Sequence, residues 1–180
     1  TGWSVANGQI DLAIIGGQLP TDLENLLQVI PYATDELALV LPSKHPLSNK
    51  KELLKEDLYK LNFVKLDSQS TTRKVVDKLL QDSGLEIQRL KIEMELNSLE
   101  AIKNAVQSGL GASFLPVVSI ERELAAGTIH KAFVADLEVK RELKLITNPS
   151  RYTSRASEVF KKNILPQFAS LESPLRKIEI

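Results

Sequence analysis

The chain of 180 residues contains no cysteine. Disulfide bonds, thiolate zinc sites, iron–sulfur clusters and thiol redox switches are therefore excluded within these residues. The longest purely apolar run is residues 37–41, whereas a membrane-spanning helix needs about 18 apolar residues. Lys and Arg together number 23, and so do Asp and Glu. With no cationic surplus to neutralise phosphates, we expect these residues alone to bind nucleic acid poorly.

Histidine is scarce, and the common catalytic motifs are absent. Of the two histidines, His45 lies in a proline-containing loop and His130 begins an expected strand, and neither has a second metal ligand at a typical spacing. Gly109 and Gly111 resemble part of a dinucleotide-binding loop, but they follow a helix and precede a strand, the reverse of the required order. A helix end followed by a tight turn explains them better. We therefore expect no metal site, no cofactor and no enzymatic activity.

The composition is otherwise that of a folded domain, with 43% hydrophobic and 26% charged residues. Expected strands alternate with expected helices, which predicts an α/β fold. The clearest helix covers residues 98–108, with Asn97 as N-cap and Glu100 completing a capping box. The expected strands are residues 10–15, 26–32, 36–41, 63–66, 90–96, 112–115, 129–134 and 143–147. The expected helices are residues 50–61, 73–83, 98–108, 116–124 and one that begins near residue 154.

We expect two polar stretches to divide the chain into two lobes. The expected strands 63–66 and 143–147 each run into a polar segment, residues 67–72 and residues 148–154. Two such crossings fit two lobes that are joined by two hinge segments, with a cleft between them. We predict that lobe I consists of residues 1–66 and 148–180, and that lobe II consists of residues 67–147.

The polar stretch at residues 67–72 is the best candidate for a binding site. Backbone N–H groups at a helix N-terminus carry partial positive charge, and hydroxyl groups add donors, so a carboxylate, phosphate or sulfate can be held there. The alternative is a plain helix cap, in which Ser70 or Thr71 only satisfies the first helical turn. Arg73 can pair with an anion or with an acidic group on the surface. The candidate residues are Ser68, Gln69, Ser70, Thr71, Thr72 and Arg73.

A second helix start repeats this arrangement at Asn97 and Ser98. Two helix N-termini that face one cleft would attract an anion. Gly17 and Gln18 follow the apolar strand 10–15, and ligands in open α/β sheets bind beyond the carboxyl ends of strands. For these positions a plain turn remains the alternative.

Four segments resemble LysR-type transcriptional regulators, in the order in which that family has them. Residues 5–16 resemble the "G-x-x-D-[LV]-A-[IL]" signature, and residues 36–46 resemble "L-x-x-V-x-P-x-x-H-P-L". Residues 67–80 resemble the hinge segment "S-G-T-R-x-x-x-D-x-x-L", although Ser68, Gln69 and Ser70 stand where many members have glycine. Residues 98–116 give the most telling match. Residues 93–98 and 146–152 are most similar to the CbbR-like regulators of carbon fixation and inorganic-carbon uptake in cyanobacteria and plastids.

The resemblance implies a periplasmic-binding-protein-like regulatory domain of two Rossmann-like lobes. Such a domain binds a small anionic effector between its lobes, here of the 2-oxoglutarate, 2-phosphoglycolate or sugar phosphate class, to control transcription of carbon-metabolism genes. Phe114 and Thr147, which lie in matching segments, join the expected effector-binding residues. Zero cysteine argues against the peroxide-sensing branch of the family, which needs a reactive thiol.

The resemblance also implies an assembly and a location. The family forms antiparallel dimers through its regulatory domains, and we expect a tetramer at full length. DNA is bound only through a winged helix-turn-helix domain, expected upstream of Thr1 together with the first strand of lobe I, and the protein is cytoplasmic with no membrane contact. The alternative is a solute-binding protein with the same two-lobed fold, which would carry a signal peptide instead.

Overall fold

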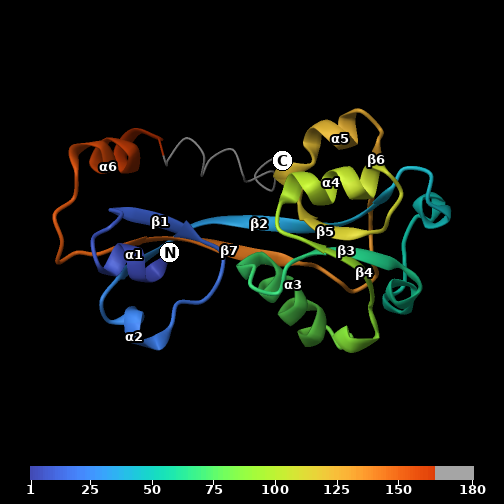
Figure 1. The fold of residues 1–180 in the computed structure, drawn as a ribbon, viewed down its shortest axis with the longest axis horizontal. Helices are drawn as coiled ribbons and strands as arrows, with labels where there is room; N and C mark the ends of the chain where they lie inside the picture. Colours follow the sequence, from blue (N-terminus) through green and yellow to red (C-terminus); the bar gives the residue numbers. More distant parts are fainter. Residues whose placement is uncertain (165–180) are drawn as a thin grey trace, which may run out of the picture. The chain divides into compact units, whose positions relative to one another are not determined.

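A computed structural model describes residues 1–164 and confirms the α/β class (Figure 1). The chain divides into two compact units. Among the described residues, the first unit combines residues 1–35 with residues 141–164, and the second unit is Glu36–Lys140. Strands β2 (Gln28–Pro42) and β7 (Lys140–Thr147) carry the chain across the boundary.

This division differs from the expected one, which assigned residues 1–66 to the first lobe and 67–147 to the second. The crossings occur inside continuous strands, so no polar linker marks them in the sequence. Residues 36–66 pack instead with the residues that follow them, in one hydrophobic cluster. That cluster includes Leu37, Leu39, Leu41, Leu53, Phe63, Val76, Leu80 and Phe114. The polar stretches 67–72 and 148–154 are therefore loops within the units.

The first unit is built around a small apolar cluster beside an antiparallel strand pair. Strand β1 (Leu12–Ile15) pairs with β7, Leu12 opposite Thr147 and Ile15 opposite Lys144. The apolar sequence of β1 predicted a strand that is covered on both faces. This is wrong, because Ile14 is 40% exposed. The helices of this unit are α1 (Gly2–Ala6), α2 (Thr21–Glu24), α6 (Arg155–Val159) and the π-helical turn Phe160–Ile164. The buried cluster consists of Val5, Ala6, Leu23, Leu27 and Ile146.

Asp11, the acidic residue of the segment that resembles the LysR signature, has a structural role. Its carboxylate accepts hydrogen bonds from the backbone N–H of Ser154, at 3.2 Å, and from the Ser154 hydroxyl. The Ser154 oxygen in turn accepts the N–H of Ser157 and caps α6. Asp11 thus fixes the start of a helix that lies more than 140 residues away in the sequence.

The second unit contains parallel and antiparallel strand pairs. Strand β3 (Asn62–Leu66) runs parallel to β4 (Lys91–Leu96), and the segment leading into β5 (Ser113–Pro116) bonds to the other edge of β3 through Ala112. Strands β5 and β6 (Ile129–Ala132) both pair antiparallel with β2. The expected strands 26–32 and 36–41 are one strand, β2.

Helices cover both faces of the parallel strands of the second unit (Figure 1). Helix α3 (Thr71–Asp82) packs on one face through Val76 and Leu80. Helix α4 (Leu99–Gln107) packs on the other face through Ile102 and Val106, in a cluster that Ile120, just before α5 (Glu121–Ala125), also joins. The short 3₁₀ turns are Pro46–Asn49, Lys55–Lys60, Ile87–Arg89 and Val117–Ser119. The expected helix at residues 50–61 is thus only the 3₁₀ turn Lys55–Lys60.

Gly109 and Gly111 end α4 and admit a close backbone approach, as the order of elements predicted. Gly109 has a φ of +83°, the left-handed conformation common after a helix C-terminus. A Cβ at Gly111 would lie 2.6 Å from the carbonyl oxygen of Asn62, at the start of β3. Glycine at position 111 is therefore what lets the segment after α4 join the sheet beside β3.

Candidate functional site

Two helix N-termini meet at one edge of the second unit. In the parallel register of β3 and β4, Leu66 lies opposite Leu96, and the N–H of Asp67 donates to the carbonyl of Leu96 at 2.9 Å. The two strands therefore end side by side, and α3 and α4 begin just beyond them. We call this edge, residues 67–72 with 97–98, the strand-end site.

The strand-end site is a topological switch point. The loop after β3 leads to α3 on one face of the sheet, whereas the loop after β4 leads to α4 on the other face. In α/β proteins, ligands bind at the carboxyl ends of adjacent parallel strands whose connections diverge in this way. The N-termini of α3 and α4, which carry the positive ends of the helix dipoles, begin at this edge and favour an anion there.

Serine caps both helices at the strand-end site. The Ser70 hydroxyl oxygen accepts the N–H of Arg73 at 3.4 Å, and the Ser98 hydroxyl oxygen accepts the N–H of Ala101 at 3.4 Å. Ser98, and not Asn97 as predicted, is the N-cap of α4, because it is Ser98 that takes the extended conformation directly before the helix. Both cap distances exceed the usual 2.7–3.2 Å range, so these are weak hydrogen bonds.

The loop between β3 and α3 is braced by its own backbone. The Asp67 carboxylate accepts the N–H of Gln69 at 2.9 Å, and the Asp67 carbonyl accepts the N–H of Ser70 at 3.1 Å. The side chains of Ser68, Gln69 and Thr71 are exposed, and that of Thr72 is half-buried. Asn97 in the neighbouring loop is also exposed. The strand-end site therefore presents polar side chains on a fixed backbone.

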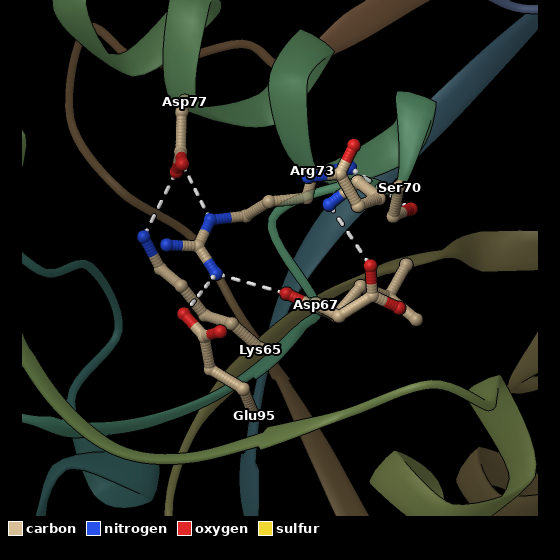
Figure 2. A network of polar contacts seen from close by, with 8 residues as sticks. Lys65, Asp67, Ser70, Arg73, Asp77 and Glu95 are labelled. Atoms are coloured by element: carbon tan, nitrogen blue, oxygen red, sulfur yellow. Dashed lines mark hydrogen bonds and ion pairs between the residues drawn. The ribbon is translucent and has the colours of Figure 1, made fainter.

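A network of four charged side chains, Lys65, Arg73, Asp77 and Glu95, lies beside this loop (Figure 2). The guanidinium of Arg73 donates to the Asp77 carboxylate, to the carbonyl of Leu66 at 2.9 Å and to the Glu95 carboxylate at 3.2 Å. The ammonium of Lys65 donates to the other oxygen of Asp77 at 2.8 Å. Lys65 is 5% exposed, and its burial lowers its pKa, an effect that the Asp77 carboxylate opposes.

The sequence predicted neither this network nor the role of Lys65. Two signals could have pointed to it. Lys65 lies inside the apolar strand 63–66, and a buried lysine needs a partner. Arg73 and Asp77 are four residues apart on one helix, a spacing that brings opposite charges together.

The other predicted site residues belong to other elements of the chain. Phe114 is buried in the second unit, where its ring stacks on that of Phe63 with centroids 6.2 Å apart. It lines a cavity of about 450 Å³ that includes no residue of the strand-end site. Gly17, Gln18 and Thr147 belong to the first unit, where Thr147 is buried in the ladder with β1. Their part in effector binding stays a prediction.

The described residues contain neither a cluster of metal-ligating side chains nor a helix suited to span a membrane. Among residues 1–164, no group of three or more His, Asp or Glu side chains is placed to hold a metal ion. Over the same part of the chain, no helix is long and apolar enough to cross a membrane. Two helix N-termini at the ends of neighbouring parallel strands define the class of arrangement with which α/β domains hold small anions.

The family follows from comparison with known proteins. Residues 3–169 match the family described as the LysR substrate binding domain, and the chain belongs to that family. It is 57% identical over 170 residues to a probable RuBisCO transcriptional regulator of Synechocystis. The matched residues make up 94% of this chain and 49% of the relative. It is also 57% identical over 168 residues to the protein of the same name from Porphyra purpurea, covering 93% and 53%. The chain thus spans about half the length of these relatives.

Solved structures share the fold. The regulatory domain of Synechocystis CcmR, in complex with 2-PG, gives a TM-score of 0.76 at 22% identity and covers 96% of this chain and 78% of that one. The effector-binding domain of QuiR, in complex with shikimate, gives 0.74 at 21% identity and covers 93% and 76%. The two-lobed, periplasmic-binding-protein-like fold expected from the sequence is therefore confirmed.

Proposed function

We propose that this chain is the effector-sensing part of a LysR-type transcriptional regulator that controls carbon-fixation genes. The proposal is supported by the family match and by relatives named probable RuBisCO transcriptional regulators. In this proposal DNA is bound by a part of the protein outside these residues, in the cytoplasm, and the chain itself catalyses no reaction. The composition supports this division of labour, because 23 basic residues are balanced by 23 acidic ones.

The effector that the strand-end site fits best is a small carboxylate or phosphate anion. The single observation that carries this assignment is the meeting of two helix N-termini at the switch point between β3 and β4. The donors there are backbone N–H groups and the side chains of Ser68, Gln69, Ser70, Thr71, Thr72, Asn97 and Ser98. The CcmR domain in complex with 2-PG makes 2-phosphoglycolate the first candidate within this class.

The regulator is proposed to act as a dimer. Among the described residues, β4 pairs only with β3, so its other edge carries no strand. Ile92 and Met94 on this strand are 41% and 38% exposed. An unpaired strand edge with exposed apolar side chains favours association with a second copy of the chain.

Calorimetric titration with 2-phosphoglycolate tests the proposed effector class, with the neutral analogue glycolamide as the matched control. We expect saturable binding of the anion only. Replacing Ser98 with Ala removes one donor and should weaken binding by about 10- to 150-fold, the effect of one charge-assisted hydrogen bond of 1.5–3 kcal/mol. The same change at Ser83, whose hydroxyl caps the opposite end of α3, should leave affinity unchanged.

Two outcomes would contradict the proposed site. Equal binding of anion and neutral analogue would show that helix N-termini do not select the ligand. A Ser98→Ala variant that melts earlier but binds normally would show that Ser98 is only a cap, whose loss costs about 1 kcal/mol of stability.

A further inference from the structure

Arg73 ties three parts of the second unit together. Its guanidinium contacts Asp77 one turn further along α3, the carbonyl of Leu66 at the end of β3, and the carboxylate of Glu95 on β4. Only 11% of the side chain is exposed. A guanidinium donates in a fixed planar fork, so these three contacts together define one position of the first turn of α3 relative to both strand ends.

The carboxylate of Asp77 pairs with both cations of this network. One of its oxygens accepts from Arg73 and the other accepts from the buried ammonium of Lys65 at 2.8 Å. Figure 2 shows the carboxylate of Asp77 between the two cations. Lys65 and Arg73 are balanced by Asp77 and Glu95, so the network adds no net charge beside the strand-end site.

We propose that Arg73 and Asp77 are positioning residues of the effector site. Asp77 orients the Arg73 guanidinium, and Arg73 fixes the first turn of α3 against β3 and β4, so that the backbone N–H groups of this turn face the strand-end site. This inference rests on the proposed function; of the two roles that the sequence left open for Arg73, it takes pairing with acidic groups in place of direct contact with the anion. The anion is then held by neutral donors of the helix turns, whose geometry the ion network maintains.

The two roles of Arg73 predict opposite effects of neutralising Asp77. If Arg73 contacted the anion directly, Asp77 would compete with the ligand, and Asp77→Asn would release the guanidinium and tighten binding. If Arg73 positions the turn, Asp77→Asn loosens it and weakens binding. Arg73→Lys separates the roles in a second way, because it keeps the positive charge but cannot make the three planar contacts.

The experiment is calorimetric titration of 2-phosphoglycolate into the protein at its natural length, at two salt concentrations. We expect Asp77→Asn and Arg73→Lys each to lower affinity at least about tenfold, the equivalent of 1.4 kcal/mol. The salt dependence of binding should match that of the unaltered protein, because no charged contact to the ligand has been lost. Tighter binding by Asp77→Asn, or unchanged affinity of Arg73→Lys, would overturn the inference.

Two controls separate positioning from general stability. Val76→Ala removes a buried contact of α3 and should lower the melting temperature while leaving affinity intact well below it. Glu86→Gln breaks an exposed pair with Arg89 and should change neither. If Val76→Ala lost as much affinity as Arg73→Lys, the network would only stabilise the second unit and would have no specific positioning role. If the unaltered protein bound no anion, the proposed function would fail together with this inference; normal anion binding with unaffected variants would reject the inference alone.

Discussion

A buried ion pair lies where the two crossing strands leave the first unit. The first unit consists of two segments of the chain. Asp35 on β2 ends the first of these segments, and Arg141 on β7 begins the second. Nε and Nη2 of Arg141 donate to one carboxylate oxygen of Asp35 at 2.8 and 2.6 Å. The side chains are 7% and 13% exposed, so solvent screens the pair weakly.

The effect of breaking this pair can be worked out from its burial. Asp35→Leu removes the carboxylate that accepts two hydrogen bonds from the buried Arg141 guanidinium, and breaking a buried ion pair by removing one partner costs about 3–5 kcal/mol. At roughly 2–4 °C per kcal/mol for a chain of this size, the melting temperature should fall by about 6–20 °C. The Arg141 side chain lies close to the backbone that follows β1, since a Cβ added at Gly16 would come within 3.1 Å of its Cδ.

Thermal unfolding of Asp35→Leu, compared with a variant of an exposed pair, checks this reasoning. Glu142 pairs with Lys144 on the same strand, β7, at 3.5 Å, with the side chains 51% and 33% exposed. Glu142→Gln should cost no more than about 1 kcal/mol. Equal shifts in the two variants would refute the reasoning, since burial would then not decide the strength of an ion pair in this unit.

Two further predictions concern the second unit. Gly111→Ala should lower the free energy of unfolding, measured by urea titration, by about 1–3 kcal/mol, because the new Cβ would meet the carbonyl oxygen of Asn62 at 2.6 Å. An unchanged urea midpoint would show that β3 can move away from the new methyl group without cost. Hydrogen bonds from Lys60, from the Leu54 N–H and from Lys50 lower the pKa of Asp57 to about 2 from 3.8. Its stabilising effect should be complete above pH 4 and disappear as the pH falls toward 2, so Asp57→Asn should flatten the stability profile across that window.

The helices and strands around the candidate site were predictable from the sequence because their signals are local. The polar run before α3, the serines at both helix starts and the glycine after α4 determine where those helices begin and end. The prediction of a strand at residues 90–96 from its alternating sequence was also correct, although Ile92 and Met94 are exposed. Which face of a strand is buried depends on what packs against it, and the alternation of apolar and polar residues alone does not determine this.

The candidate site was partly predictable for the same reason. The sequence indicated two polar helix starts, and the structure brings them together because β3 and β4 are neighbours in a parallel register. The sequence left the role of Arg73 open between an anion and an acidic partner. Its partners Leu66 and Glu95 lie on two strands, and only their pairing shows that the guanidinium is already engaged.

The division into units was decided only by the tertiary structure. A hinge in the form of a flexible linker leaves a polar composition, but here the chain crosses inside β2 and β7, whose residues read as ordinary strand. The sequence determined the α/β class and both helix starts through short-range capping and periodicity. The crossing points, the register that joins the two helix starts and the charge network beside them depend on contacts between residues far apart in the chain, which no local pattern encodes.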